Sequence, residues 1–392
     1  MSSWPSRWPP LRGGTLVLLL AVAACNGGGF DSRVPTEITL NSTNVTLAAV
    51  GQNLQLTATV LDQNGDPIAD APVAWTSANP AIVSVSGTGL LIAQGPGTAA
   101  VTATAGEASG TATVNVKTYD ITIRYLSDIT NSQRLAFSEA ERRWESLVIG
   151  DLPDVQSLPA DPPPVCHPQT PGPFDDLTIF VTIDSIDGPD GTLGQAGPCF
   201  VRSTGNLPIT GRMQFDVEDM EILEAEGSLQ SVILHEMAHV VGFGTVWKLL
   251  GLLQDSSVAD PDPPLADTHF TGALAIAAFN AAGGTGYTGA KVPVMNTGGA
   301  GTVNSHWRDG VFDPELMTGF LNIGFNPLSA ISVRSLQDLG YVVSVAGADP
   351  FTLAPGFRIA GRRRGRHLIN DIISDPIRRV TADGRVVDVI RP

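Results

Sequence analysis

The chain has 392 residues, and its 42 glycines and 29 prolines make up about 18% of it, against roughly 12% in average proteins. This excess favours turn-rich β structure over a helical bundle or a coiled coil. The formal net charge of −16 argues against a nucleic-acid-binding protein, and the length favours two domains with their own cores. Residues 346–392 differ from the rest because nine arginines outnumber five aspartates there. We expect them to form a basic, solvated C-terminal tail.

The first residues have the pattern of an export signal. Two arginines precede an apolar run over residues 15–24, which is too short to span a bilayer. The run ends in Val22-Ala23-Ala24-Cys25, which resembles a bacterial lipobox, where the cysteine is lipidated and becomes the mature N-terminus. The resemblance implies a signal peptide over 1–24, a tether over 25–35 and a lipid anchor at the bacterial cell envelope, in the outer membrane or at the cell surface. The alternative is ordinary signal cleavage nearby, with Cys25 left as a free thiol.

The other two cysteines allow one disulfide. With Cys25 acylated, Cys166 and Cys199 are left as a possible pair in an oxidising compartment. Alternatively, Cys166 and His167 could hold a metal or act as an inhibitory thiolate, although no second ligand lies nearby in the sequence.

Residues 36–118 have the spacing of a small, antiparallel all-β sandwich. Apolar residues alternate with Thr, Ser or Gln in short segments separated by turn clusters such as Asp62-Gln63-Asn64-Gly65. The expected strands are 37–40, 54–60, 73–76, 82–85, 100–104 and 112–116, around a core Trp75. The segment from Leu56 to Thr104 resembles a bacterial Ig-like domain of group 2, as found in invasin-type surface proteins. We interpret this domain as a spacer, since it shows no exposed aromatic cluster or charged patch.

Residues 119–345 have an α+β layout. Strands are expected at 121–125, 177–183 and 211–216, and a helix capped by Ser132 is expected to run to Trp144. A further helix carries the sequence His235-Glu236-Met237-Ala238-His239. The four-residue spacing places both imidazoles on one helix face, where they can bind one Zn²⁺ ion, and Glu236 lies close enough to act as a base.

A catalytic zinc ion needs a third protein ligand. Gly242 follows His239 as in the metzincin motif HExxHxxGxxH, but the final histidine of that motif is replaced by Thr245. The segment NSHWRDGVFDPELMTG (304–319) resembles the leishmanolysin family, as do HEMAHVVGFG, LGQAGPC and PLSAISVRSLQDLGYVV. By this resemblance His306 is the third ligand, with 66 residues between it and His239, and Met317 is the Met-turn residue below the metal.

Two other residues are alternative candidates for the third zinc ligand. His269 is nearer in sequence, but no Met-turn follows it and a small apolar helix begins just after it. A gluzincin arrangement would need Glu315, which the family resemblance already places beside Met317. This chain also has an Ig-like module where leishmanolysins carry a propeptide whose cysteine blocks the zinc, so latency through a thiol is not expected.

These features predict a zinc-dependent endopeptidase that acts on extracellular proteins or peptides. Glu236 would take the proton from zinc-bound water and deliver it to the leaving amine. The strand at Met213-Gln214-Phe215 is a candidate edge against which an extended substrate could pair. The alternative is a non-catalytic surface adhesin or interaction lipoprotein with a structural zinc site. The oligomeric state is not predicted.

Overall fold

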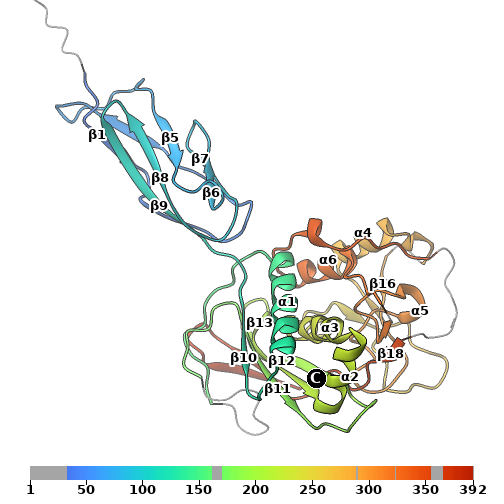
Figure 1. Cartoon of the computed structure of the whole chain (residues 1–392). Helices are drawn as coiled ribbons and strands as arrows, with labels where there is room; N and C mark the ends of the chain where they lie inside the picture. The colour runs from blue at the N-terminus through green and yellow to red at the C-terminus, as the bar shows by residue number, and fades with distance from the viewer. Residues whose placement is uncertain (1–32, 161–169, 288–289, 323, 355–364, 392) are drawn as a thin grey trace, which may run out of the picture.

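The computed structural model describes residues 33–160, 170–287, 290–322, 324–354 and 365–391. An elongated β domain is followed by a larger α/β domain (Figure 1). Among the described residues, no helix combines the length and the apolar character needed to cross a membrane.

The N-terminal domain is a sandwich of short strands. One sheet has the order β2-β9-β8-β5, a second has the order β3-β7-β6, and β1 pairs with β4. Alternate side chains of β2, β7, β8 and β9 meet in one buried cluster, as period-two strands require. The strands are β1 (Glu37–Leu40), β2 (Asn44–Leu47), β3 (Asn53–Gln55), β4 (Ala58–Leu61), β5 (Ala74–Ser77), β6 (Val83–Val85), β7 (Leu90–Ala93), β8 (Gly97–Ala105) and β9 (Ala108–Val116).

Three details of this domain differ from expectation. The expected strand 54–60 is broken, because Leu56 donates its amide to the carbonyl of Gly89 and the chain then changes sheets. Strands β2 and β9 are parallel, so the sandwich is not wholly antiparallel. Trp75 is only partly buried and packs on the edges of two apolar clusters.

The second domain is built on a mixed sheet in the order β10-β11-β13-β12-β19-β20. Strands β10, β11 and β13 are mutually parallel, and β12 runs antiparallel to β13. Strand β12 covers the glycine-rich stretch around Cys199, which had not been expected to be a strand. The bounds are β10 (Ile121–Tyr125), β11 (Leu177–Asp184), β12 (Gly194–Arg202), β13 (Pro208–Asp216), β19 (Ile377–Val380) and β20 (Val386–Ile390); smaller pairings involve β14 (Leu253–Gln254), β15 (His269–Phe270), β16 (Val292–Pro293), β17 (Phe320–Asn322) and β18 (Gly365–His367).

Helices α1 and α3 lie side by side against this sheet (Figure 1). Their apolar residues, including Phe137, Trp144 and Ile233, join Met213 and Phe215 of β13 in the main core. The cap of α1 is Thr130 and not Ser132: its hydroxyl accepts the amide of Gln133, whose side chain accepts the amide of Thr130. The helices are α1 (Asn131–Leu147), α2 (Val217–Glu226), α3 (Leu229–Val241), α4 (Ala273–Ala281), α5 (Asp309–Phe312) and α6 (Ala330–Leu339), with 3₁₀ turns at Gly284–Gly286 and Val345–Gly347.

The expectation of a solvated C-terminal tail over 346–392 is wrong for residues 365–391. Strands β19 and β20 form a hairpin that extends the main sheet beyond β12, and β18 pairs with β17. The hairpin itself agrees with the Asp383-Gly384 turn in the sequence. The sheet edge that accepts it could not be recognised, because the sequence does not give the strand order.

Candidate metal centre

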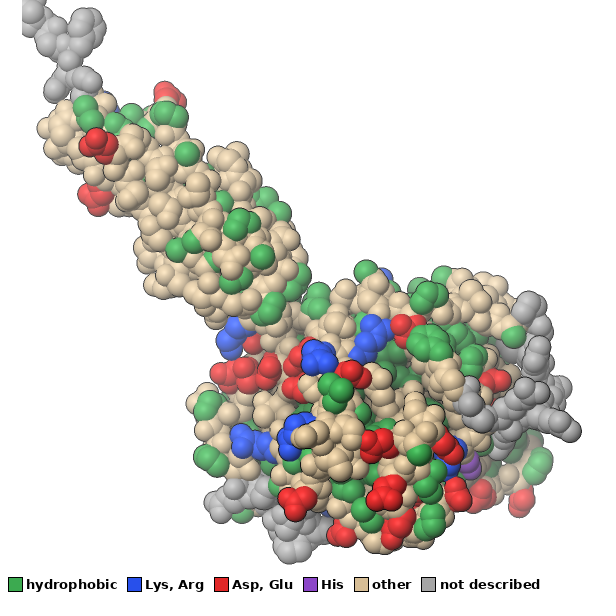
Figure 2. Space-filling model, in the orientation of Figure 1, with side chains coloured by type: hydrophobic (Ala, Val, Ile, Leu, Met, Phe, Trp, Pro, Cys, Tyr) green, Lys and Arg blue, Asp and Glu red, His purple; other side chains and the backbone are tan. Residues whose placement is uncertain are grey.

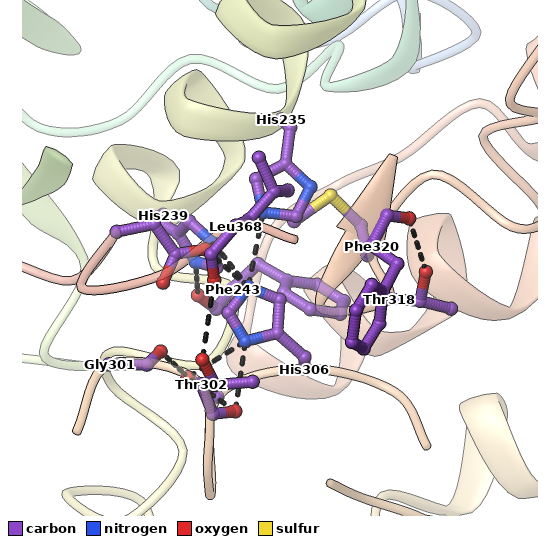
Figure 3. A network of polar contacts seen from close by, with 12 residues as sticks. His235, His239, Phe243, Gly301, Thr302, His306, Thr318, Phe320 and Leu368 are labelled. Carbon is purple, nitrogen blue, oxygen red and sulfur yellow. Dashed lines mark hydrogen bonds and ion pairs between the residues drawn. The ribbon is translucent and has the colours of Figure 1, made fainter. Parts of the chain in front are cut away.

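Three histidine rings converge in the core of the second domain. The Nε2 atoms of His235 and His239 are 3.0 Å apart, and each lies 3.1 Å from Nε2 of His306. All three side chains are fully buried. Figure 3 shows the rings turned toward one another, with Thr302 and Leu368 beside them. The structure thus brings together the three predicted zinc ligands.

Helix α3 supplies two of these histidines. Its apolar residues pack into the core, and its four-residue spacing aligns His235 and His239. The helix ends at Gly242, whose φ of 117° is a conformation that an L side chain rarely adopts. Thr245, which stands where the motif histidine is missing, donates its hydroxyl to the carbonyl of His239 instead.

A loop fixed on both sides holds His306. The carbonyl of His306 accepts the amide of Met295, and the amide of Trp307 is donated to the carbonyl of Met317. The Trp307 ring stacks between Trp247 and Phe312, and its indole N–H donates to Ser332. This packing places His306 beside the helix although 66 residues separate it from His239 in the sequence.

Met317 lies in a buried turn next to His235. The Nδ1 atom of His235 lies 2.8 Å from the carbonyl oxygen of Leu316, and the amide of Met317 donates to a carboxylate oxygen of Glu315. Glu315 also accepts hydrogen bonds from Ser329 and Ser332, and it is fully buried. Glu315 therefore supports the turn and is not a ligand, which removes the gluzincin arrangement.

The outer nitrogens of the rings show that the site fits a cation. The Nδ1 atoms of His235, His239 and His306 face the carbonyl oxygens of Leu316, Phe243 and Thr302 at 2.8, 2.9 and 3.0 Å. A carbonyl oxygen only accepts, so each Nδ1 carries the hydrogen and each Nε2 presents a lone pair. Three lone pairs this close repel unless a cation lies between them. Tetrahedral Zn²⁺ with bonds of 2.0–2.1 Å would hold its ligands about 3.3 Å apart, close to the observed separations.

Burial controls the charges of this site. Burial lowers the pKa of His235 and of His239, which keeps both rings neutral, as metal ligands must be. Burial, followed by the negative charge of Asp371, raises the pKa of Glu236. Glu236 is fully buried, and neither of its carboxylate oxygens has a hydrogen-bond partner among the described residues. The absence of a side chain on Gly194 makes room for it, since a Cβ there would lie 3.3 Å from Cγ of Glu236.

A fourth group at the site, Asp371, was not predicted from the sequence. Oδ2 of Asp371 lies 2.8 Å from Nε2 of His306, 3.4 Å from that of His235 and 3.8 Å from that of His239. Asp371 lies in the segment expected to be solvent-exposed, and no motif surrounds it. The four side chains together could hold one metal ion.

The other predicted residues lie elsewhere. His269 is in β15, where its ring contacts the carbonyl of Asp267 and lies near the carboxylate of Asp255. Cys199 is fully buried and disulfide-bonded. Cys166 and Cys25 lie outside the described residues, so the Cys166–Cys199 pairing and the lipidation of Cys25 stay predictions.

The expected substrate-binding edge is also placed differently. Met213-Gln214-Phe215 belongs to β13, which is paired on both sides, by β11 and by β12. It therefore has no free edge. Strand β12 borders the metal centre instead, and its outer side contacts the C-terminal segment.

Two family models match parts of this chain. Residues 163–354 match the family model described as leishmanolysin, and residues 35–116 match that of the bacterial Ig-like domain, group 2. Similar solved structures include domains 4 and 5 of the S-layer protein SbsC, with 27% identity over 22% of this chain and 53% of that chain and a TM-score of 0.20. Another is the Yersinia pseudotuberculosis adhesin InvE, with 24% identity over 20% of this chain and 26% of that chain and a TM-score of 0.15.

The chain spans about half the length of that SbsC fragment. No curated protein matches the chain. The order of the two family matches is the order predicted from the sequence. The chain thus joins a segment that matches the group 2 bacterial Ig-like domain to one that matches leishmanolysin, a family of metallopeptidases.

Proposed function

We propose that the protein is a zinc-dependent endopeptidase that hydrolyses peptide bonds of extracellular proteins. The observation that carries this proposal is the buried triad of His235, His239 and His306 with the unpartnered carboxylate of Glu236 beside it. A buried carboxylate without partners costs free energy, and such a cost is usually retained for function.

Each residue of the site has a role in this reaction. His235, His239 and His306 would hold Zn²⁺, which when bound polarises a peptide carbonyl and acidifies water. Glu236 would accept the proton of the attacking water and pass it to the leaving amine. The turn at Met317 would keep the His235 ring in place through the carbonyl of Leu316.

We also propose that the enzyme is displayed at the bacterial cell envelope by a lipid on Cys25. The Ig-like domain would then act as a stalk. On the face shown in Figure 2, charged side chains are sparse along this domain and gather on the peptidase domain. A surface with few charges and no exposed aromatic cluster suits a spacer better than a binding module.

One observation favours a second candidate function, a non-catalytic lipoprotein with a structural zinc site. Asp371 completes a set of four protein side chains, and structural zinc sites are usually closed by four ligands. Glu236 argues against this alternative, because a purely structural site has no use for a buried, unpartnered carboxylate.

The test is hydrolysis of casein and of a fluorogenic peptide library by the zinc-loaded chain from residue 26 onward. We expect cleavage that a chelator abolishes and that Glu236→Gln reduces by a factor of about 10² to 10⁴ without loss of zinc. Glu221→Gln, on the exposed side of α2, is the matched control. Cleavage that persists in Glu236→Gln would contradict the proposed role of this residue.

A further inference from the structure

The fourth side of the metal centre is closed by the chain itself. Asp371 is 1% exposed, while Glu236 and the three histidines are fully buried. Oδ2 of Asp371 faces the Nε2 atoms of all three rings, the nearest at 2.8 Å. An active zinc peptidase needs this position for water and the substrate carbonyl. The structure therefore represents a state that substrate cannot enter.

The segment that carries Asp371 is held on one side by the loop of His306. Strand β18 pairs with β17, and the amide of Leu368 donates to the carbonyl of Gly319. The hydroxyl of Thr302 donates to the carbonyl of Leu368, a contact visible in Figure 3. Gly301 approaches closely, since a Cβ there would lie 2.9 Å from Cα of Asn370.

On the other side the same segment occupies the edge of β12. The amide of Ala196 donates to the carbonyl of Asp371 at 2.7 Å, and the amide of Ile373 donates to the carbonyl of Ala196 at 3.0 Å. These backbone groups of β12 thus bond directly to the residue whose side chain faces the histidines, and an extended peptide would use such groups to add a strand. The segment thus blocks both the metal position and the adjoining strand edge.

Ion pairs at both ends of the segment add to its attachment. Arg366 pairs with Asp190 and with Glu226 of α2, and Asp375 pairs with Arg212 of β13. These side chains are partly exposed, so each pair contributes little free energy and is weakened by salt. Asp371 itself lies outside residues 163–354, which match the peptidase family.

From these contacts we infer that residues 365–375 form an autoinhibitory segment, in which Asp371 takes the fourth position around the metal. Moving the segment away opens the metal position and frees the edge of β12 together. The unpartnered Glu236 distinguishes this latent site from a permanently structural one. The inference rests on the proposed function, because only an active peptidase can be autoinhibited. Binding of Asp371 to the metal, however, can be measured without any peptidase activity.

The decisive experiment uses the chain from residue 26 with Co²⁺ in place of zinc. In the wild type, Asp371 occupies the fourth metal position, so the visible spectrum of the bound Co²⁺ should not change when azide or acetohydroxamate is added. In Asp371→Ala the Co²⁺ should remain bound, and its spectrum should respond to both. Asp388→Ala, which removes an aspartate from β20 of the same C-terminal segment, is the matched control and should behave like the wild type. A wild-type spectrum that responds like that of Asp371→Ala overturns the inference.

A second variant leaves the metal ligands intact. Arg366→Ala removes the pairs to Asp190 and Glu226, so the amides of Leu368 and Ile373 should exchange hydrogen faster while metal content stays the same. Unchanged exchange at low ionic strength, where these pairs are screened least, would contradict the proposed contribution of Arg366 to the attachment.

Peptide hydrolysis by the zinc-loaded variants separates this inference from the proposed function. Asp371→Ala should cleave at least about tenfold faster than the wild type, since a charge-assisted contact no longer competes with substrate. A variant whose Co²⁺ site opens but which cleaves no peptide would support ligation by Asp371 and refute the peptidase. If the wild type and Asp371→Ala cleave peptide at equal rates and neither Co²⁺ spectrum responds to added ligand, the autoinhibitory role of the segment is refuted and the proposed peptidase function is not.

Discussion

At the scale of single residues, the ligand set depends on a choice between two histidines. His306 faces the rings of His235 and His239 from a buried loop, whereas His269 contacts Asp267 at the side of a short strand. Geometry therefore favours His306 although His269 is nearer in sequence.

Removing each histidine in turn tests this choice. We expect His306→Ala to lose at least tenfold in zinc affinity, because three ligands and their fixed orientation are needed to hold the ion. His269→Ala should bind zinc as the wild type does. The measurement is zinc content by elemental analysis after dialysis against a competing chelator. Retention of zinc in His306→Ala together with its loss in His269→Ala would reverse the assignment.

Some residues of the metal centre could be predicted from local sequence and others could not, for a physical reason. His235, Glu236 and His239 lie on one helix, so their geometry follows from a local repeat. His306 depends on a contact across 66 residues, and only the family resemblance pointed to it. Asp371 depends on the seating of a C-terminal segment against β12 and β17, which no local pattern encodes.

At the scale of elements, the start of α1 depends on one hydroxyl. Thr130 accepts the amide of Gln133, whereas Ser132 contacts only the Thr130 hydroxyl. Thr130→Ala should lower the free energy of unfolding by about 1 kcal/mol, because the first turn of α1 loses its capping box. Ser132→Ala should have a much smaller effect. Urea denaturation of both variants measures the difference, and equal losses would show that the two hydroxyls share the cap.

Helix α1 also carries a carboxyl group in an unfavourable place. Burial raises the pKa of Glu141 to about 7, with additional contributions from Glu145 one turn later and from Asp120. Because the folded pKa lies above the ordinary value of 4.5, this group lowers stability as the pH rises from 4.5 through 7. Glu141→Gln should therefore raise Tm at pH 8 and change it much less at pH 5.

Thermal unfolding of Glu141→Gln at the two pH values gives the comparison. Glu221→Gln, exposed on α2, shows the effect of removing one negative charge from the molecule as a whole. A Tm gain in Glu141→Gln that is the same at pH 5 and pH 8 would exclude the titration of Glu141 as its cause.

Most elements were predictable because their hydrophobic period is local. Strands β1, β10 and β11 lie close to the expected ranges. The predicted strand 54–60 is wrong because the chain moves from one sheet to another at Leu56. Strand β12 was not predicted because its sequence contains two glycines and a proline, which are uncommon in strands. In both cases the outcome depends on neighbouring strands that are distant in the sequence.

At the scale of the whole molecule, the two domains have separate cores. The apolar clusters of the Ig-like domain and of the peptidase domain share no residue. The junction is polar: the amide of Asp151 donates to the carbonyl of Ala48, and Lys117 lies within 3.4 Å of Asp151 and Asp154. Such a contact contributes little to the stability of either core.

Removal of the Ig-like domain should therefore leave the metal centre intact. We expect a chain that starts at Lys117 to bind one zinc ion and to unfold within a few degrees of the peptidase transition of the longer chain. Lys117 is kept because Asp151, Asp154 and Asp175 surround its ammonium group. Calorimetry of the longer chain should show two transitions, of which only one shifts when zinc is removed. A single transition that zinc shifts as a whole would mean that the two domains unfold together and that the Ig-like domain stabilises the domain that holds the metal centre.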